Sequence, residues 1–283
     1  MAVKIIVDST CDLSLEEIDR LGLLRAPLTL HWDGREYRDG VDMAPAEFFE
    51  RLVGSSTLPT TSQVPVPVFE DLFRQVVGAG DEAVVMTLSH NLSGTYQSAT
   101  IAKESLEDQA GRIHLVDTGS GSLGSMLLVD EAVKLRDSGC TASEIAERLN
   151  GIKGRLVIYA CVETLKFLHK GGRLSTGAAV VGTLLSVKPV LCIEDGLISV
   201  ANKVRGNAAA YQWLASEMAK VGHDSNYPVV VGSTQCPELV RQFTDAVSEK
   251  TGIVCKRFCD IGTVIGTHVG PGAVAVAFIK PTK

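Results

Sequence analysis

The chain has 283 residues, of which 45% are hydrophobic, so it can bury one large core or two of modest size. Its 33 acidic residues outnumber its 27 basic ones, which gives a net charge of −6. Since no run of lysine and arginine offsets this balance, the composition argues against a nucleic-acid partner. The seven cysteines include no CxxC pair, and we interpret them as reduced thiols.

The sequence does not predict export or membrane insertion. Its first ten residues, MAVKIIVDST, contain no long apolar stretch followed by a small-residue cleavage site. The most apolar later stretch, 178–191, is interrupted by Ser186, Lys188 and Pro189 and is too short to span a bilayer. We therefore expect a cytoplasmic protein with no stable membrane insertion.

The first half of the chain alternates short apolar runs with helical patterns. Buried strands are predicted at 3–10, 82–89 and 112–117, and another apolar stretch spans 23–30. Helices are predicted to begin at the capping box Ser14-Leu-Glu-Glu17, at Pro45 and near Ser93. Strands that alternate with helices imply crossover connections and hence a parallel sheet.

The second half has a different pattern, which favours antiparallel pairing. Asp195-Gly196 separates two apolar runs within 187–202, as the turn of a β-hairpin does. Further strands are predicted at 153–161, 227–234, 252–261 and 273–280. We predict an α/β fold with two domains: residues 1–150 with a mostly parallel sheet, and residues 151–283 with a mixed or antiparallel sheet.

One glycine motif raises the question of a nucleotide cofactor. Gly119-Ser-Gly121-Ser-Leu-Gly124 matches the dinucleotide pattern G-x-G-x-x-G between a strand and a helix. That site also needs an acidic residue at the end of a second strand about twenty residues later, whereas Asp137 ends a predicted helix. Close packing of a helix on a strand is the favoured interpretation. The chain also has no G-x-x-x-x-G-K-[ST] motif, so we expect no cofactor and no ATP site.

Hydroxyl side chains gather where the predicted strands end. They are Ser9, Thr10, Thr60, Thr61, Ser62, Ser89 and Ser93. Ligands bind beyond the carboxyl ends of strands in open α/β sheets. Ser93 is predicted to cap a helix whose backbone N–H groups face an anion. Several hydroxyls without a nearby carboxylate suit an acidic ligand group better than a metal.

Two more glycine-rich segments carry candidate site residues. Lys170-Gly-Gly-Arg173 places an arginine directly after a backbone bend, and 265–272 places His268 in a predicted glycine-rich turn. Ser93, His268 and Asp8 leave a serine hydrolase or transferase open as an alternative, although Leu92-Ser-Gly is not the G-x-S-x-G elbow of hydrolases.

Six segments in order along the whole chain together resemble the DegV family of fatty-acid-binding proteins. They are Val7-Asp-Ser-Thr-Cys-Asp-Leu13, Pro59-Thr-Thr-Ser-Gln63, Leu92-Ser-Gly-Thr-Tyr-Gln-Ser-Ala99, 165–175, Lys188-Pro-Val-Leu191 with Asp195-Gly196, and Gly266-Thr-His-Val-Gly-Pro-Gly-Ala273. The family includes the FakB-type subunit of bacterial fatty acid kinase.

The resemblance implies a non-catalytic carrier for a long-chain fatty acid, with roles for particular residues. Thr61 and Ser93 correspond to the residues that bind the carboxylate, while Ser62, Arg173 and His268 are expected near this head group. A separate ATP-dependent kinase subunit phosphorylates the bound acid to an acyl phosphate. Arg205, in the stretch 202–205, resembles the arginine that docks this kinase.

Overall fold

A computed structural model describes residues 1–174 and 187–282 of the chain. The first sheet has the strand order β2-β1-β6-β7, and all of its pairs are parallel, as predicted. Its strands are β1 (Val3–Asp8), β2 (Leu24–Ala26), β6 (Glu82–Thr87) and β7 (Ile113–Asp117). Helices cover both of its faces, which is why the central strands are nearly continuous apolar runs.

The second sheet has the order β10-β9-β8-β13-β11-β12 and is mixed, because only β11 and β12 pair in parallel. Its strands are β8 (Leu156–Cys161), β9 (Val187–Glu194), β10 (Leu197–Arg205), β11 (Val230–Ser233), β12 (Arg257–Asp260) and β13 (Val274–Ile279). Asp195 and Gly196 both have positive φ and close the predicted hairpin between β9 and β10.

A third, small sheet was not predicted. It has the order β4-β3-β5 and comprises β3 (Thr29–Trp32), β4 (Arg35–Arg38) and β5 (Thr60–Ser62). The apolar stretch 23–30 is therefore divided between two sheets, with Pro27, which has no N–H to donate to a ladder, at the break. The predicted strand 252–261 is also shorter, since only β12 forms within it.

The helices begin largely where local sequence signals place them. They are α1 (Leu15–Arg20), α2 (Pro45–Gly54), α3 (Val66–Gly78), α4 (Thr95–Glu104), α5 (Leu123–Asp137), α6 (Ala142–Lys153), α7 (Lys166–Lys170), α8 (Gly206–Val221), α9 (Pro237–Thr251) and α10 (Thr263–Val269). Short 3-10 turns span Ser9–Cys11 and Glu107–Arg112. The Ser14–Glu17 capping box is confirmed, and Pro45 occupies the first turn of α2.

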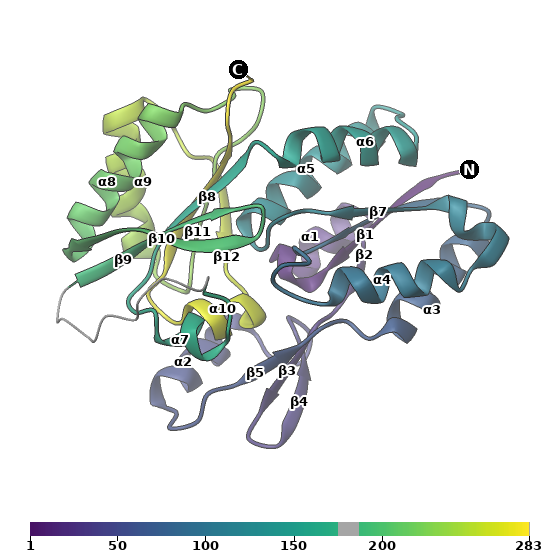
Figure 1. Cartoon of the computed structure of the whole chain (residues 1–283), viewed down its shortest axis with the longest axis horizontal. Coiled ribbons are helices and arrows are strands. Elements are labelled where there is room, and N and C mark those ends of the chain that lie inside the picture. Colours follow the sequence, from purple (N-terminus) through teal and green to yellow (C-terminus); the bar gives the residue numbers. More distant parts are fainter. Residues whose placement is uncertain (175–186, 283) are drawn as a thin grey trace.

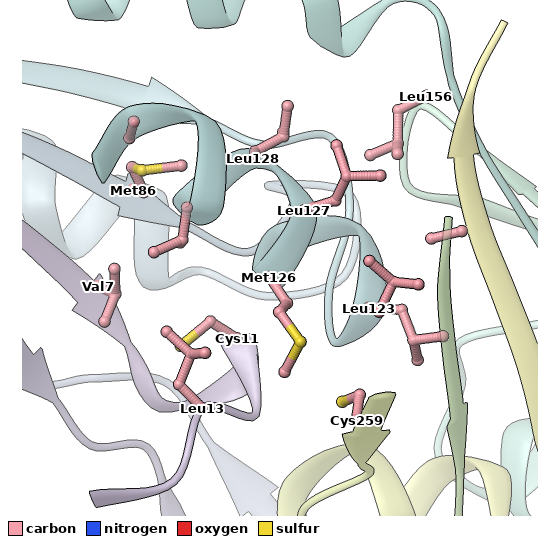
Figure 2. Packing of buried hydrophobic residues seen from close by; sticks show 14 of the residues in the cluster. Val7, Cys11, Leu13, Met86, Leu123, Met126, Leu127, Leu128, Leu156 and Cys259 are labelled. Carbon is pink, nitrogen blue, oxygen red and sulfur yellow. The ribbon is translucent and has the colours of Figure 1, made fainter. Parts of the chain in front are cut away.

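Helix α5 lies between the two large sheets and joins their cores. Figure 2 shows Leu123, Met126, Leu127 and Leu128 of this helix among side chains from both halves of the chain. Gly124 allows the close contact, because a Cβ there would lie 2.9 Å from Leu156 and Ile158 side-chain atoms. The G-x-G-x-x-G motif thus serves helix–strand packing, as we favoured.

The outer faces are covered separately. Helices α8 and α9 lie side by side over the second sheet, while α2 packs against the small sheet (Figure 1). Because one hydrophobic cluster includes residues of both large sheets, the division into domains near residue 150 stays a prediction. Within the described ranges, no helix is long and apolar enough to span a membrane. The apolar stretch 178–191 lies partly outside those ranges.

Candidate ligand-binding pocket

Three segments far apart in the sequence meet at one pocket. Strand β5 contributes Thr61, the loop after β6 contributes Ser93, and α10 contributes His268. In Figure 1, α10 lies beside α7 and α2 and close to β5. The lining residues are Leu28, Thr61, Ser62, Gln63, Leu88, Leu92, Ser93, Leu168, Arg173, Ile198, Val264, Ile265, His268 and Val269. Of the predicted site residues, Thr61, Ser62, Ser93, Arg173 and His268 therefore come together, whereas Arg205 does not line the pocket.

His268 is held by one hydrogen bond and one close contact. Its Nε2 atom lies 2.9 Å from Thr61 Oγ1, across 207 positions of sequence. Its Nδ1 atom has no hydrogen-bond partner in the described structure and lies against Gly171, where a Cβ would be only 2.2 Å away. Burial, and then the charge of Arg173, lower the pKa of His268 to about 4, so the ring is neutral at pH 7.

The local structure at His268 differs from the predicted turn. His268 is in the last turn of the short helix α10, and the turn follows it, with positive φ at Gly270 and Gly272. Gly266 and Gly270 allow this helix to pack closely on aromatic rings, because a Cβ at these positions would lie 2.5 Å from Phe49 and 2.3 Å from Phe167. The glycine spacing therefore reflects helix packing in addition to a turn.

Ser93 lines the pocket from the loop that directly precedes α4. Its Oγ atom lies 3.0 Å from Thr95 Oγ1 and accepts a hydrogen bond from the Thr95 backbone N–H at 3.3 Å. The residue that caps α4 is Gly94, so the prediction that Ser93 occupies the cap was wrong by one position.

Gln63 is a pocket residue that was not predicted. It lines the pocket, and its Nε2 atom donates to Ser98 Oγ at 2.8 Å. The sequence feature that could have indicated Gln63 as a pocket residue is its place at the end of the motif Pro59-Thr-Thr-Ser-Gln63.

Arg173 brings a positive charge to the same side of the pocket. The preceding Gly172 has positive φ, as a bend there requires, and Arg173 Nε donates to the carbonyl oxygen of Leu92 at 3.1 Å. This bond ties the arginine to the residue that precedes Ser93. Ser62 also lines the pocket, but its Oγ lies 2.8 Å from His31 Nε2, on the small sheet.

An apolar cavity adjoins the polar pocket and shares Leu92, Ile198, Ile265 and Val269 with it. Its walls come from α5 and the second sheet, which sequence reasoning did not identify. Its other lining residues are Gly121, Ser122, Leu123, Ile158, Ala160, Val162, Leu191, Ile193, Ile261, Ala273 and Ala275. The first cavity is therefore lined in part by hydroxyl, imidazole and guanidinium groups, and the adjoining one almost entirely by hydrocarbon.

The β9–β10 hairpin closes over this region. Asn91 Nδ2 donates to the carbonyl oxygen of Asp195 at 3.0 Å, and a Cβ at Gly196 would lie only 1.9 Å from Ser89 Oγ. The hairpin turn therefore contacts the loop that carries Ser93, and Ile198 of the same hairpin lines both the pocket and the apolar cavity.

The geometry does not support the serine hydrolase alternative. Asp8 is buried, and its oxygens accept from the Thr10 N–H, the Thr10 hydroxyl and the Leu88 N–H, not from His268. His268 bonds Thr61, and Ser93 bonds Thr95, so no base contacts the Ser93 hydroxyl in the described parts of the chain. Over the same residues, no group of three or more His, Cys, Asp or Glu side chains has the arrangement of a metal site.

The fold and the pocket define an α/β protein in which a pocket with polar side chains lies next to an apolar cavity. Residues 2–281 match the family model described as "Uncharacterised protein, DegV family". A DegV domain-containing protein of Caldanaerobacter subterraneus subsp. tengcongensis is 33% identical over 281 residues, 98% of each chain. The chain belongs to the DegV family, as its motifs indicated.

Solved structures of similar proteins have the same fold. A stearic-acid-binding protein from Eubacterium ventriosum has a TM-score of 0.89 at 28% identity, covering 99% of this chain and 98% of its own. A DegV lipid-binding protein from Thermotoga maritima has a TM-score of 0.87 at 28% identity, covering 100% of both chains. A DegV protein from Thermus thermophilus described by its fatty acid binding has a TM-score of 0.84 at 28% identity, covering 99% of this chain and 100% of its own. The predicted α/β fold with a parallel and a mixed sheet is confirmed.

Proposed function

We propose that this protein binds one long-chain fatty acid, with the carboxylate at Thr61 and Ser93 and the acyl tail in the apolar cavity. The observation that carries this proposal is that the polar pocket and the apolar cavity lie next to each other and share four lining residues. The similar proteins from Eubacterium ventriosum and Thermus thermophilus are described as binding stearic acid and fatty acid, which supports the same ligand class here.

The tail supplies most of the affinity. Each buried CH₂ contributes about 0.8 kcal/mol, so roughly fifteen methylenes contribute on the order of 12 kcal/mol before the costs of binding. No elaborate recognition of the tail is needed for tight binding. The head group instead fixes the orientation of the ligand.

The head group needs donors because a fatty acid, like glutamate, titrates near pH 4.3 and is ionised at neutral pH. An unpaired carboxylate in an apolar site is prohibitively costly. Neutral His268 can donate from Nε2 to Thr61 Oγ1, which leaves the Thr61 hydroxyl hydrogen free to point at a ligand oxygen. This tautomer leaves Nδ1 unprotonated, so the ring has no buried N–H group without an acceptor. Ser93 supplies a second hydroxyl, and Arg173 a nearby positive charge.

We further propose that the bound acid is a substrate for a separate ATP-dependent kinase subunit in the cytoplasm, which converts it to an acyl phosphate. The chain itself has no P-loop motif for ATP. Arg205, the exposed last residue of β10, lies outside the pocket lining and is the proposed contact with the kinase. An exposed arginine suits an acidic patch on a partner protein.

Native and denaturing mass spectrometry of the purified protein test the fatty acid proposal. We expect one bound fatty acid in the native spectrum and the unmodified chain mass after denaturation. Thr61→Ala and Ser93→Ala should each weaken retention, because an ionised oxygen then lacks a donor at a cost of about 1–3 kcal/mol. The double variant should lose nearly all bound lipid, while Thr244→Ala on α9, outside both cavities, serves as the control.

Full lipid occupancy in the double variant would contradict the head-group assignment. Covalent labelling of Ser93 by a fluorophosphonate would instead support the hydrolase alternative, because this reagent reacts with activated serines.

A further inference from the structure

We propose that Asp39 and Asp12 are positioning residues that hold α10 and thereby fix His268 against Thr61. This inference rests on the proposed role of the pocket in binding a carboxylate. The helix has seven residues, and its cap residue Gly262 offers no side chain to its first turn. So short a helix is not stable on its own, and its placement depends on contacts from other parts of the chain.

Asp39 supplies the first of these contacts from the end of the small sheet. Its Oδ1 atom accepts a 2.7 Å hydrogen bond from the hydroxyl of Thr263, the first residue of α10, across 224 positions. Both side chains are buried, with 3% and 1% exposure. A buried hydrogen bond to a carboxylate is stronger than one between neutral groups, so this contact strongly restrains the start of the helix.

Asp12 restrains the preceding residue. It follows the first 3-10 turn with a left-handed backbone, and its Oδ2 atom accepts from Ser122 Oγ at 2.5 Å. Its Oδ1 atom lies so close to Gly262 that a Cβ there would be 2.6 Å away. Asp12 and Asp39 therefore both contact the chain where it enters α10.

These restraints reach His268 through the body of the helix. Thr267 Oγ1 donates to the carbonyl oxygen of Thr263 at 2.8 Å, which ties the residue before His268 to the anchored one. At the far end, His268 Nε2 has a 2.9 Å contact with Thr61, and a small shift of the helix would break it. The side chains of Asp12 and Asp39 do not line the pocket at Thr61 and Ser93, so they reach it through α10. Asp12 also holds Ser122, which lines the apolar cavity.

Variants of Thr263 test this inference without changing any charge. Thr263→Val keeps the side-chain shape but removes the donor to Asp39, whereas Thr263→Ser retains the donor. Each purified, delipidated variant is measured in two ways: by oleate binding at equilibrium, and by the ¹⁵N chemical shifts of the His268 ring across a pH series. Thr244→Val on α9 is the matched control, because Thr244 is a half-buried threonine whose hydroxyl donates to the Arg241 carbonyl oxygen within α9 itself, and it lines neither cavity.

We expect Thr263→Val to weaken oleate binding about tenfold and to change the His268 ring shifts and pKa, while Thr263→Ser and Thr244→Val resemble the parent. Unchanged binding and ring shifts in a folded Thr263→Val variant would overturn the inference, as would equal losses in the valine and serine variants. If Thr263→Val fails to fold, Thr263→Ala, which removes the donor without adding atoms, replaces it in the same comparison.

The two measurements separate this inference from the proposed function. If the parent protein binds no oleate, the fatty acid proposal fails, and the ring shifts of the ligand-free variants still decide whether Asp39 positions His268.

Discussion

His268 occupies the space that Gly171 leaves open by having no side chain. A Cβ on residue 171 would lie 2.2 Å from Nδ1 of the ring, far inside contact distance. Gly171 ends α7 with a φ of −75°, a conformation that any residue adopts, so the backbone does not require a glycine here. The imidazole is the closest neighbour of a Cβ at this position, and the Phe167 carbonyl oxygen follows at 3.2 Å.

Gly171→Ala should therefore displace His268 and weaken fatty acid binding at least tenfold, with little loss of fold. The methyl group fits beside Nδ1 only if the ring moves, and a moved ring loses the 2.9 Å contact of its Nε2 atom with Thr61. Gly154→Ala is the matched control, because Gly154 also ends a helix with φ near −66° and has nothing within 4 Å of an added Cβ. Equal binding by the two variants would show that the imidazole is free to move.

The low pKa of His268 predicts a specific dependence of stability on pH in the ligand-free protein. Unfolding exposes the ring and returns its pKa from about 4 to about 6.5. Between these values the unfolded chain binds a proton that the folded chain does not, so stability falls as the pH falls through this range. The loss attributable to His268 is at most about 3 kcal/mol near pH 4.

Asp8 acts in the opposite direction. Burial raises its pKa to about 6, so in acid the folded chain takes up this proton before the unfolded chain does, and the folded state is stabilised. The measurement must therefore compare the parent with His268→Gln, which cannot take up this proton. Urea unfolding of both proteins from pH 7.5 to 4.5 should show a difference in stability that shifts in favour of the glutamine variant as the pH decreases. Parallel curves would mean that His268 is not buried in its neutral form.

The local elements were predictable from the sequence, and the contacts between distant segments were not. The Ser14–Glu17 capping box, the first-turn proline and the Asp195-Gly196 turn depend on a few adjacent residues, and all three were found as predicted. The small sheet and α10 depend on partners far along the chain, such as Asp39 for Thr263. Family motifs therefore predicted Thr61 and His268 as candidate site residues, and both line the same pocket, but the motifs predicted neither their direct contact nor the helix that carries His268.

The wall of the apolar cavity offers a test of where the acyl tail lies. Ala160 on β8 and Ala275 on β13 are paired neighbours, and both side chains line the cavity. Ala160→Leu should fill part of this space and shift the co-purified lipids toward shorter chains, because overpacking a close-packed interior is unfavourable. Ala209→Leu, on the exposed side of α8, controls for the added hydrophobic side chain. Mass spectrometry of extracted lipids with an unchanged chain-length profile would place the tail elsewhere.

Arg205 and His268 allow ligand binding to be tested separately from the proposed phosphorylation by a kinase subunit. Arg205 is exposed and outside the pocket lining, so Arg205→Ala should leave lipid occupancy intact but reduce acyl-phosphate formation with a cognate kinase subunit. His268→Ala should weaken binding, as displacement of the ring does, and should lower turnover by a larger factor, because phosphoryl transfer depends on positioning and on stabilising charge at the head group. Arg241→Ala is the matched control for the loss of a surface arginine, because the Arg241 side chain is exposed on the outer side of α9. Loss of lipid from Arg205→Ala would place this residue in the binding site after all. Unchanged phosphorylation by both the Arg205 and the His268 variants would mean that neither residue takes part in the transfer.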